Sequence, residues 1–293
     1  MQGILITGGT GFIGSALIRD LMALNHQITV LTRSPEAHRT KFPEQVRLVG
    51  NLADIDQQID SVVNLAGANL FARRWTTHYK QCLRQSRIEL TRQLVAWMEA
   101  QASPPHTLIS GSAVGYYGDR GDAELTERAP AGFDFGAQLC RDWEAEANAY
   151  KSGRVVCIRT GIVLGNGGAL KQMLPPFKFG LGAILGSGNQ YWPWISLADE
   201  VAAIRWIMDN ETMIGPVNLT APEPVPQSVF AKTLARQLRR PCFLNMPASV
   251  LRLIVGEASE ILLASQRCVP EVLMEHGFRF QYPSLTQALK SLL

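Results

Sequence analysis

The stretch Gly3 to Gly14, GILITGGTGFIG, constrains the fold of this chain more than any other feature. Its apolar run, Ile4 to Ile6, is typical of a strand that is buried on both faces of a parallel sheet. The glycines that follow permit a tight turn, a close approach of backbone to phosphate, and packing of a helix on the strand. The sequence therefore predicts a dinucleotide-binding loop formed by Gly8, Thr10, Gly11, Phe12, Ile13 and Gly14.

The residues after the loop favour this interpretation over the alternative of a flexible surface turn. Apolar residues recur at helical spacing at Ile13, Leu17, Leu21 and Leu24, so an amphipathic helix begins at the glycines. The free N–H groups at the start of that helix would point at a bound anion.

Composition indicates an ordinary globular chain. At 293 residues it is long enough for one large α/β domain or one domain with an appendage, present as a monomer or homodimer. A net charge of +3 with 18% charged residues does not indicate nucleic acid or a membrane as partner. The five scattered cysteines suggest reduced thiols and no apolar run reaches membrane-span length, so we expect a cytoplasmic protein. The histidines are isolated, so no metal site is expected.

The end of the second predicted strand, Gln27 to Arg33, bears on the choice of cofactor. An acid about twenty residues after the glycines would accept a hydrogen bond from a ribose 2′-OH and repel a 2′-phosphate. This chain has Thr32, Arg33 and Ser34 there, a cation between two hydroxyls. The pattern predicts NADP as the cofactor, and the alternative is that Arg33 is a solvated surface charge.

Two further strand ends are expected to line the cofactor. The strand Val46 to Val49 leads to Leu52, which we place at the adenine pocket. The strand Ser61 to Gly67 ends in the small residues Ala66 and Gly67, which allow the sheet edge to lie against the cofactor.

A basic segment runs from Phe71 to Arg92. Lys80, Arg84 and Arg87 share one face of a predicted helix, where like charges repel unless an anion lies nearby. That face is either solvated or, at Arg87, directed at the cofactor phosphates. The loop before the helix supplies three residues that we expect to hold a negatively charged substrate: Arg73, Arg74 and Trp75.

The fifth predicted strand, Thr107 to Ala113, carries the candidate catalytic groups. Ligands of open parallel sheets bind beyond the carboxyl ends of the strands. The residues placed to meet a substrate there are Ser112, Tyr116 and Tyr117. Their alternative roles are capping of the strand end for the serine and core packing for the tyrosines.

Strands and helices alternate along the chain, which predicts an α/β fold with a doubly wound parallel sheet of the Rossmann type. The expected NADP-binding Rossmann domain covers residues 1–165 and is completed by about 190–220. A smaller C-terminal α/β substrate lobe covers 166–189 and 221–293. We expect one strand at Val155 to Leu164, an irregular pocket wall at 169–190, one helix at Ala248 to Ala264, and a strand at Phe278 to Tyr282.

Several motifs together resemble the extended short-chain dehydrogenases/reductases. They are GGTGFIG, NLAG, RRWT from Arg73, SGSAVGYYG from Ser110, and RTGIVLGNGGALKQMLPPF from Arg159. The resemblance is strongest to the epimerase-like family (sugar nucleotide epimerases) with a C-terminal DUF1731 region, here from about residue 245. It implies NADP binding through the matching positions Thr32, Arg33, Leu65, Ala66, Arg87 and Val163.

The chain departs from this family pattern at one helix. Relatives that transfer hydride carry Y-x-x-x-K there, and the lysine lowers the pKa of the tyrosine so that it exchanges protons near neutral pH. Here Phe135 and Leu139 occupy the two positions, and a register shifted by one offers Gly136 and Cys140. Neither pair replaces the tyrosine and lysine, so the chain resembles the atypical members.

Two functional hypotheses follow. In the first, Ser112 orients a substrate oxygen and Tyr116 or Tyr117 supplies a proton, in an NADP-dependent reductase or epimerase whose substrate is small and anionic or a sugar nucleotide. In the second, the chain binds NADP(H) and a ligand without turnover, as a sensing or interaction module.

Overall fold

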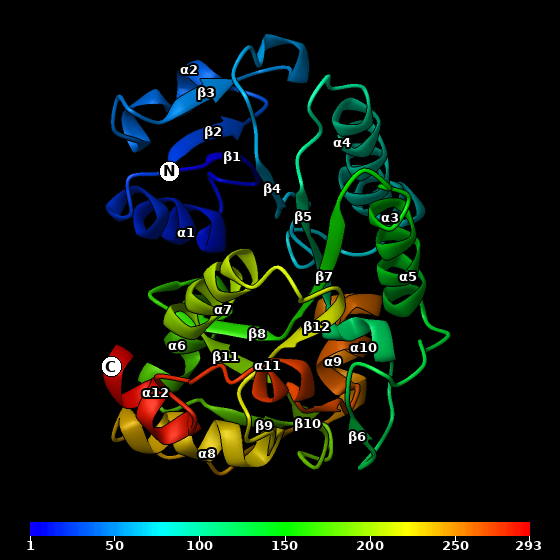
Figure 1. Cartoon of the computed structure of the whole chain (residues 1–293). Helices are drawn as coiled ribbons and strands as arrows, with labels where there is room; N and C mark the ends of the chain where they lie inside the picture. The colour runs from blue at the N-terminus through cyan, green and yellow to red at the C-terminus, as the bar shows by residue number, and fades with distance from the viewer.

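A seven-stranded parallel sheet forms the centre of the molecule in the computed structural model, which describes residues 1–293 (Figure 1). All neighbouring strands are parallel, in the order β12-β7-β5-β4-β1-β2-β3. Their bounds are β1 Gly3–Thr7, β2 Gln27–Leu31, β3 Arg47–Val49, β4 Ser61–Asn64, β5 Thr107–Ala113, β7 Arg154–Thr160 and β12 Gly215–Leu219. The strand order reverses between β1 and β4, which is where ligands bind in open α/β sheets. The predicted fold class is confirmed.

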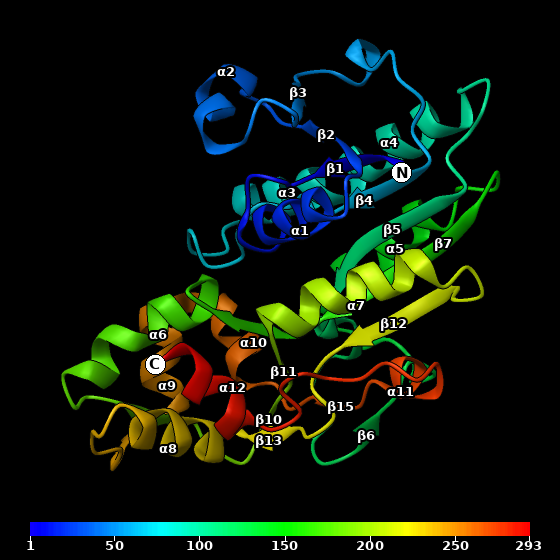
Figure 2. The ribbon, with the colours of Figure 1, turned by 60° about the vertical axis from the view of Figure 1, so that its left-hand side comes forward.

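Helices cover both faces of this sheet because its strands are apolar on both sides. β1 is buried throughout. On one face lie α1 (Phe12–Ala23) and α7 (Leu197–Asp209), which share a core cluster with β1. On the other lie α4 (Leu90–Glu99) and α5 (Phe135–Ala147), which pack through Leu94 and Ala147. Figures 1 and 2 show these two layers on opposite sides of the sheet.

Shorter elements connect the layers. α2 (Pro35–His38) follows β2, and a 3₁₀ turn at Leu52–Asp54 follows β3. The basic segment forms α3 (Thr77–Arg84), which continues through a π-helical turn at Gln85–Glu89 into α4. A 3₁₀ turn at Val114–Tyr117 follows β5.

The C-terminal lobe has its own core, centred on Trp194, Phe230 and Leu289. Four two-stranded pairs hold it together: β8 with β11, β9 with β14, β10 with β13, and β6 with β15. The strands are β6 Glu124–Leu125, β8 Ile162–Gly165, β9 Ala183–Leu185, β10 Tyr191–Trp192, β11 Trp194–Ser196, β13 Val225–Pro226, β14 Leu244–Met246 and β15 Arg267–Cys268. The helices are α6 Gly168–Lys178, α8 Gln227–Gln237, α9 Ala248–Val255, α10 Ser259–Leu263, α11 Glu271–Glu275 and α12 Leu285–Leu292.

The expected irregular wall at 169–190 is wrong for its first half, which forms the helix α6. Pro175 and Pro176 suggested a break, but they lie in the last turn and remove few hydrogen bonds. Burial of Leu170 and Phe177 stabilises the helix, so packing overrides the local signal.

The expected single strand Val155 to Leu164 is also wrong, because the chain leaves the sheet at Gly161. β7 ends before this glycine, and β8 after it pairs with β11. A Cβ at Gly161 would lie 2.8 Å from the carbonyl oxygen of Pro193, so close backbone packing at the bend requires glycine.

The last two expected elements differ as well. The single helix at 248–264 is interrupted at Gly256, whose φ of +74° ends α9 and separates it from α10. Residues 278–282 form no strand. The backbone N–H groups of Gln281 and Tyr282 donate to the carboxylate of Asp199 instead of to a neighbouring strand. None of the helices is long and apolar enough to span a membrane.

Beside Asp199, α7 carries a fully buried carboxyl group. Glu200 is 0% exposed; its Oε1 accepts a hydrogen bond from Thr160 at 2.9 Å, and its Oε2 has no partner. Burial raises the pKa of Glu200 from about 4.5 to about 8. The group is therefore neutral at neutral pH in the folded chain.

This pKa predicts a loss of stability as pH rises from about 4.5 to about 8. Within that window the folded state retains a proton that the unfolded state has lost, so each pH unit costs up to about 1.4 kcal/mol. The variant Glu200→Gln stays neutral, so its free energy of unfolding relative to the wild type should increase from pH 4.5 to pH 8.

Urea unfolding across this pH range tests the expectation. Glu223→Gln, which removes an exposed carboxyl group, is the matched control and should follow the wild-type profile. Parallel profiles for Glu200→Gln and the wild type would show that Glu200 ionises normally in the folded chain.

Candidate functional site

The glycine-rich loop packs directly against the end of β4. Gly8 has φ +69°, and a Cβ there would lie 2.6 Å from the backbone of Leu65. A Cβ at Gly14 would lie 2.4 Å from the carbonyl oxygen of Gly8, and the Gly11 N–H donates to that oxygen at 2.9 Å. Only glycine fits at Gly8 and Gly14, so the loop has the tight form that the sequence predicted.

The start of α1 presents free backbone donors. Gly11 caps the helix without a side-chain hydrogen bond, and the first turn holds no acid. Such a helix N-terminus attracts negative charge through its dipole and its unpaired N–H groups. Phe12 lies beside it, with its ring against Gly167 and Gly168 of the segment that follows β8. Thr10 and Ile13 lie in the same loop and first turn.

The residues after β2 remain free for a ligand. Arg33 is exposed and forms no ion pair or hydrogen bond with the rest of the chain. Ser34 caps α2 through its backbone only, and Thr32 donates its N–H to Val49 at 3.0 Å. Leu52 packs against the cluster that contains Leu5, at the same edge of the sheet.

Arg87 lies over the end of β4. A Cβ on Gly67 would lie 2.9 Å from its Cζ, and its Nη2 donates to the carbonyl oxygen of Ala68 at 3.0 Å. Its guanidinium also stacks on Trp143, 5.3 Å from the ring centroid. Burial lowers the pKa of Arg87, although an arginine keeps its charge. Gly67, one of the two small residues predicted here, thus leaves room for this cation. Ala66, the other, donates its N–H to Thr7 Oγ1 at 3.2 Å.

The other cations of that helix face have partners. Lys80 pairs with Glu257, and Arg84 pairs with Asp142 at 2.8 Å. Arg87 has no carboxylate partner. Of the three cations on this helix face, it is therefore the one that is available to a bound anion. Val163, inside β8, is buried in the main core cluster.

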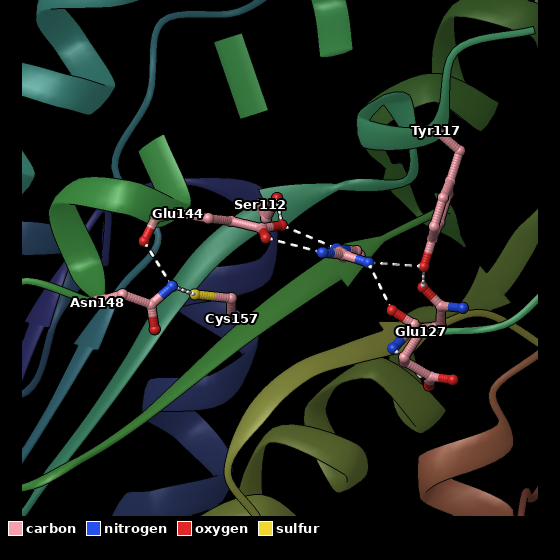
Figure 3. A network of polar contacts seen from close by, with 8 residues as sticks. Ser112, Tyr117, Glu127, Glu144, Asn148 and Cys157 are labelled. Carbon is pink, nitrogen blue, oxygen red and sulfur yellow. Dashed lines mark hydrogen bonds and ion pairs between the residues drawn. The ribbon is translucent and has the colours of Figure 1, made fainter. Parts of the chain in front are cut away.

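Ser112 belongs to a buried polar network (Figure 3). Its hydroxyl donates to Glu144 Oε1 at 2.6 Å, and the two oxygens of Glu144 accept from Arg159 Nε and Nη2 at 2.8 Å each. Burial alone would lower the pKa of Arg159, but hydrogen bonds to Glu144 and the charge of that residue raise it. Because the Ser112 proton goes to Glu144, the serine oxygen can only accept from a ligand.

The two tyrosines differ sharply in environment. Tyr117 is 0% exposed; its hydroxyl donates to Asn218 at 2.7 Å and accepts from Arg159 at 3.0 Å. Burial raises the pKa of Tyr117 well above its usual value. Tyr116 is half-buried, its ring lies 3.5 Å from Cζ of Arg159, and its hydroxyl has no partner in the chain. Tyr116 therefore has the available hydroxyl.

The positions expected for Y-x-x-x-K are occupied by packing residues. Phe135 contacts Trp75 edge-on, with centroids 5.1 Å apart, and Lys80 lies over the Phe135 ring at 4.9 Å. Leu139 is buried in the cluster that contains Trp75. In the shifted register Cys140 is buried, and burial raises its pKa to about 11.

In the loop expected to hold an anionic substrate, Arg74 and Trp75 contact other parts of the chain, whereas Arg73 does not. Arg74 donates to the carbonyl oxygens of Leu253 at 2.6 Å and Ile254 at 3.2 Å, at the end of α9. Trp75 is buried and donates to Leu70 at 2.8 Å. Arg73 is exposed and unpaired, so it alone is free for a substrate; its role stays a prediction.

Sequence reasoning missed the Glu144–Arg159 pair. The one feature of the sequence that indicates such a pair is Arg159 itself, which lies inside the apolar run VVCIRTGIVL. A charged side chain in a buried strand requires a partner. No spacing rule identifies Glu144 as that partner. Glu127 was likewise assigned no role from the sequence. Its Oε1 accepts hydrogen bonds from the backbone N–H of Asn218 at 2.9 Å and of Val272 at 3.3 Å.

Comparison with known proteins supports the resemblance. The model of the NAD dependent epimerase/dehydratase family matches residues 4–219, and a domain of unknown function, DUF1731, matches 246–292. An epimerase family protein of Mycobacterium bovis is 43% identical over 98% of this chain and 96% of its own length. One from Staphylococcus aureus is 38% identical over 100% of this chain and 99% of its own.

A solved structure agrees over the whole length. The human epimerase family protein SDR39U1, crystallised with NADPH, has a TM-score of 0.91 and 33% identity, covering 99% of this chain and 98% of that one. A UDP-glucuronic acid 4-epimerase from Bacillus cereus, solved with NAD, shares the fold at 16% identity, with a TM-score of 0.77 and coverage of 98% and 96%. The chain therefore belongs to the NAD-dependent epimerase/dehydratase family, in the branch that carries a C-terminal DUF1731 region.

Proposed function

We propose that this chain binds NADP(H) and carries out reductase or epimerase chemistry on a small anionic substrate such as a sugar nucleotide, with Tyr116 as the proton-carrying group. The observation that carries the proposal is that Arg33 and Arg87 have no carboxylate partner and that the Tyr116 hydroxyl has no hydrogen bond in the chain. By contrast, Lys80 and Arg84 pair with carboxylates, and the Tyr117 hydroxyl donates to Asn218.

The cofactor choice rests on the end of β2. Arg33 is exposed and unpaired, and neither flanking residue is acidic, so nothing there repels a 2′-phosphate. The related human protein was crystallised with NADPH. The Gly8 cradle and the open start of α1 suit the diphosphate of either nicotinamide nucleotide.

NADP(H) supplies or accepts a hydride when bound, and the chain must hold the substrate and move a proton. The hydroxyl of Tyr116 has no partner in the chain, and its ring lies against the guanidinium of Arg159. Ser112 accepts a hydrogen bond from a substrate hydroxyl, since its own proton goes to Glu144. Arg73 and Arg87 provide positive charge for an anionic substrate or cofactor group.

One observation favours binding without turnover as a second candidate. Phe135 and Leu139 pack in an apolar cluster at the positions where hydride-transferring relatives carry tyrosine and lysine. In that case NADPH binds but no carbonyl compound or UDP-sugar is converted.

Arg33 is expected to determine the preference for NADPH over NADH. Arg33→Ala should weaken NADPH binding about tenfold to a hundredfold, because a charge-assisted hydrogen bond contributes about 1.5–3 kcal/mol, and should leave NADH binding unchanged. Titration calorimetry with both nucleotides measures this. Arg236→Ala, an exposed cation on α8, is the control. Equal losses for NADPH and NADH, or no loss, would remove Arg33 from the cofactor site.

The two adjacent tyrosines are expected to differ in their effects on activity and stability. Tyr116→Phe should lower NADPH oxidation with a panel of carbonyl compounds and UDP-sugars by about 10²–10⁴-fold, with unchanged stability and NADPH binding. Tyr117→Phe should instead cost about 1–3 kcal/mol of stability, because it leaves buried polar groups of Asn218 and Arg159 unpaired.

The readouts are the decrease in NADPH absorbance and the urea unfolding midpoint of each variant. Full activity in Tyr116→Phe would exclude this tyrosine as the proton carrier. NADPH binding without turnover of any compound in the wild type would favour the second candidate.

A further inference from the structure

Two segments of the C-terminal lobe place large apolar side chains in solvent. Phe179 and Leu181, just after α6, are 81% and 60% exposed. Phe243 and Leu244, at the start of β14, are 73% and 37% exposed. We call these four residues the apolar patch.

The two segments lie side by side. β14 pairs with β9 so that Leu244 stands beside Ala183, two residues after Leu181. A Cβ on Gly180 would lie 3.7 Å from Pro241, so the chain contacts itself between the two aromatic residues. The two segments therefore bring the four exposed side chains to one part of the lobe, and exposed apolar clusters of this kind mark interaction sites.

Unpaired cations border the patch. Lys178 precedes Phe179, and Arg239 and Arg240 precede Phe243 by a few residues. All three are exposed, and none forms an ion pair. Neither 147–198 nor 224–256 contains an Asp or Glu, so α6, β9, α8, β14 and α9 contribute no carboxylate. The small net charge of the whole chain conceals this local asymmetry.

The patch lies away from the candidate site. In both views α8 lies at the end of the molecule opposite β3, and Figure 1 shows β9 beside α8 (Figures 1 and 2). No residue of the glycine-rich loop or the Ser112 network belongs to the patch. None of its four residues has a role in the function proposed above.

The chemistry of the patch selects among possible occupants. A second copy docking on the same patch about a two-fold axis would bring Lys178, Arg239 and Arg240 against their own copies, and like charges repel. A nucleic acid could contact the cations with its phosphates and stack its bases on the aromatic rings, but this stacking would leave the exposed leucines without a partner. An anionic bilayer surface suits both features, because aromatic and aliphatic side chains enter the headgroup boundary while cations contact the lipid phosphates.

We propose that this face of the C-terminal lobe docks reversibly on anionic lipid bilayers through Phe179, Leu181, Phe243 and Leu244, with Lys178, Arg239 and Arg240 contacting the headgroups. This inference is carried by exposed apolar side chains and unpaired cations that lie together on two segments without Asp or Glu.

Vesicle sedimentation of the full chain tests the proposal. The protein should pellet with vesicles of phosphatidylcholine mixed with phosphatidylglycerol, but not with phosphatidylcholine alone, and added salt should weaken binding. Phe179→Ser combined with Phe243→Ser should abolish pelleting. Lys178→Ser and Arg240→Ser should each reduce the partition coefficient about fivefold, from about 1 kcal/mol per cation near the surface.

Phe133→Ser is the matched control, because Phe133 is 86% exposed but lies before α5, outside the patch. It should pellet like the wild type, and thermal unfolding should show that all variants fold.

No pelleting with anionic vesicles, or equal loss in Phe133→Ser, overturns the proposal. A dimer in light scattering that Phe243→Ser dissociates would identify a second copy as the occupant. Tighter binding of a labelled oligonucleotide than of vesicles would identify nucleic acid.

Discussion

The buried ion pair between Arg159 and Glu144 fixes the geometry of the candidate site. Arg159 stands next to Ser112 in the register of β7 and β5, and Glu144 reaches it from α5 with two hydrogen bonds of 2.8 Å. Removing one partner of such a pair costs about 3–5 kcal/mol, because the remaining charge stays buried. The strand end, the helix and the following turn are therefore held in one arrangement. Within it the hydroxyl protons of Ser112 and Tyr117 are both donated to the protein, whereas the Tyr116 hydroxyl has no partner in the chain.

The C-terminal region contributes to the same arrangement through polar contacts. Glu257 pairs with Lys80 of α3, and Arg74 donates to the last carbonyl groups of α9. Glu127 accepts from the backbone of Asn218 in β12 and of Val272 in α11. These contacts join the loop after β4 and the edge of the sheet to the segment matched by DUF1731. They also explain why the basic helix face tolerates its charges, since the neutralising carboxylates come from distant parts of the chain.

Local patterns were sufficient to predict the elements whose stability is local. The strands β1, β4 and β5 are apolar runs, and the glycine loop follows from the absence of a Cβ at Gly8 and Gly14. The helix α6 was not predicted because its two prolines indicate a break in the local sequence. The packing that stabilises it involves distant residues. Tyr116 and Tyr117 are identical in sequence terms, yet one 3₁₀ turn directs only one of them into the core. Pairings such as Arg159 with Glu144 depend on which helix packs against which strand, and no spacing rule contains that information.

The packing of α5 shows why the tyrosine and lysine of hydride-transferring relatives could not simply be reintroduced. Leu139 is buried in a cluster with Trp75 and Ala258, so it helps to join α5 to the loop after β4 and to the C-terminal segment. A lysine ammonium at that position would lose its hydration without gaining a carboxylate, and burial would drive its pKa down until it was neutral. A hydroxyl added to Phe135 would have Lys80 nearby, but Lys80 already pairs with Glu257. These two positions therefore stabilise the packing of α5 against its neighbours. In the function proposed above, the proton-carrying group lies instead in the turn after β5.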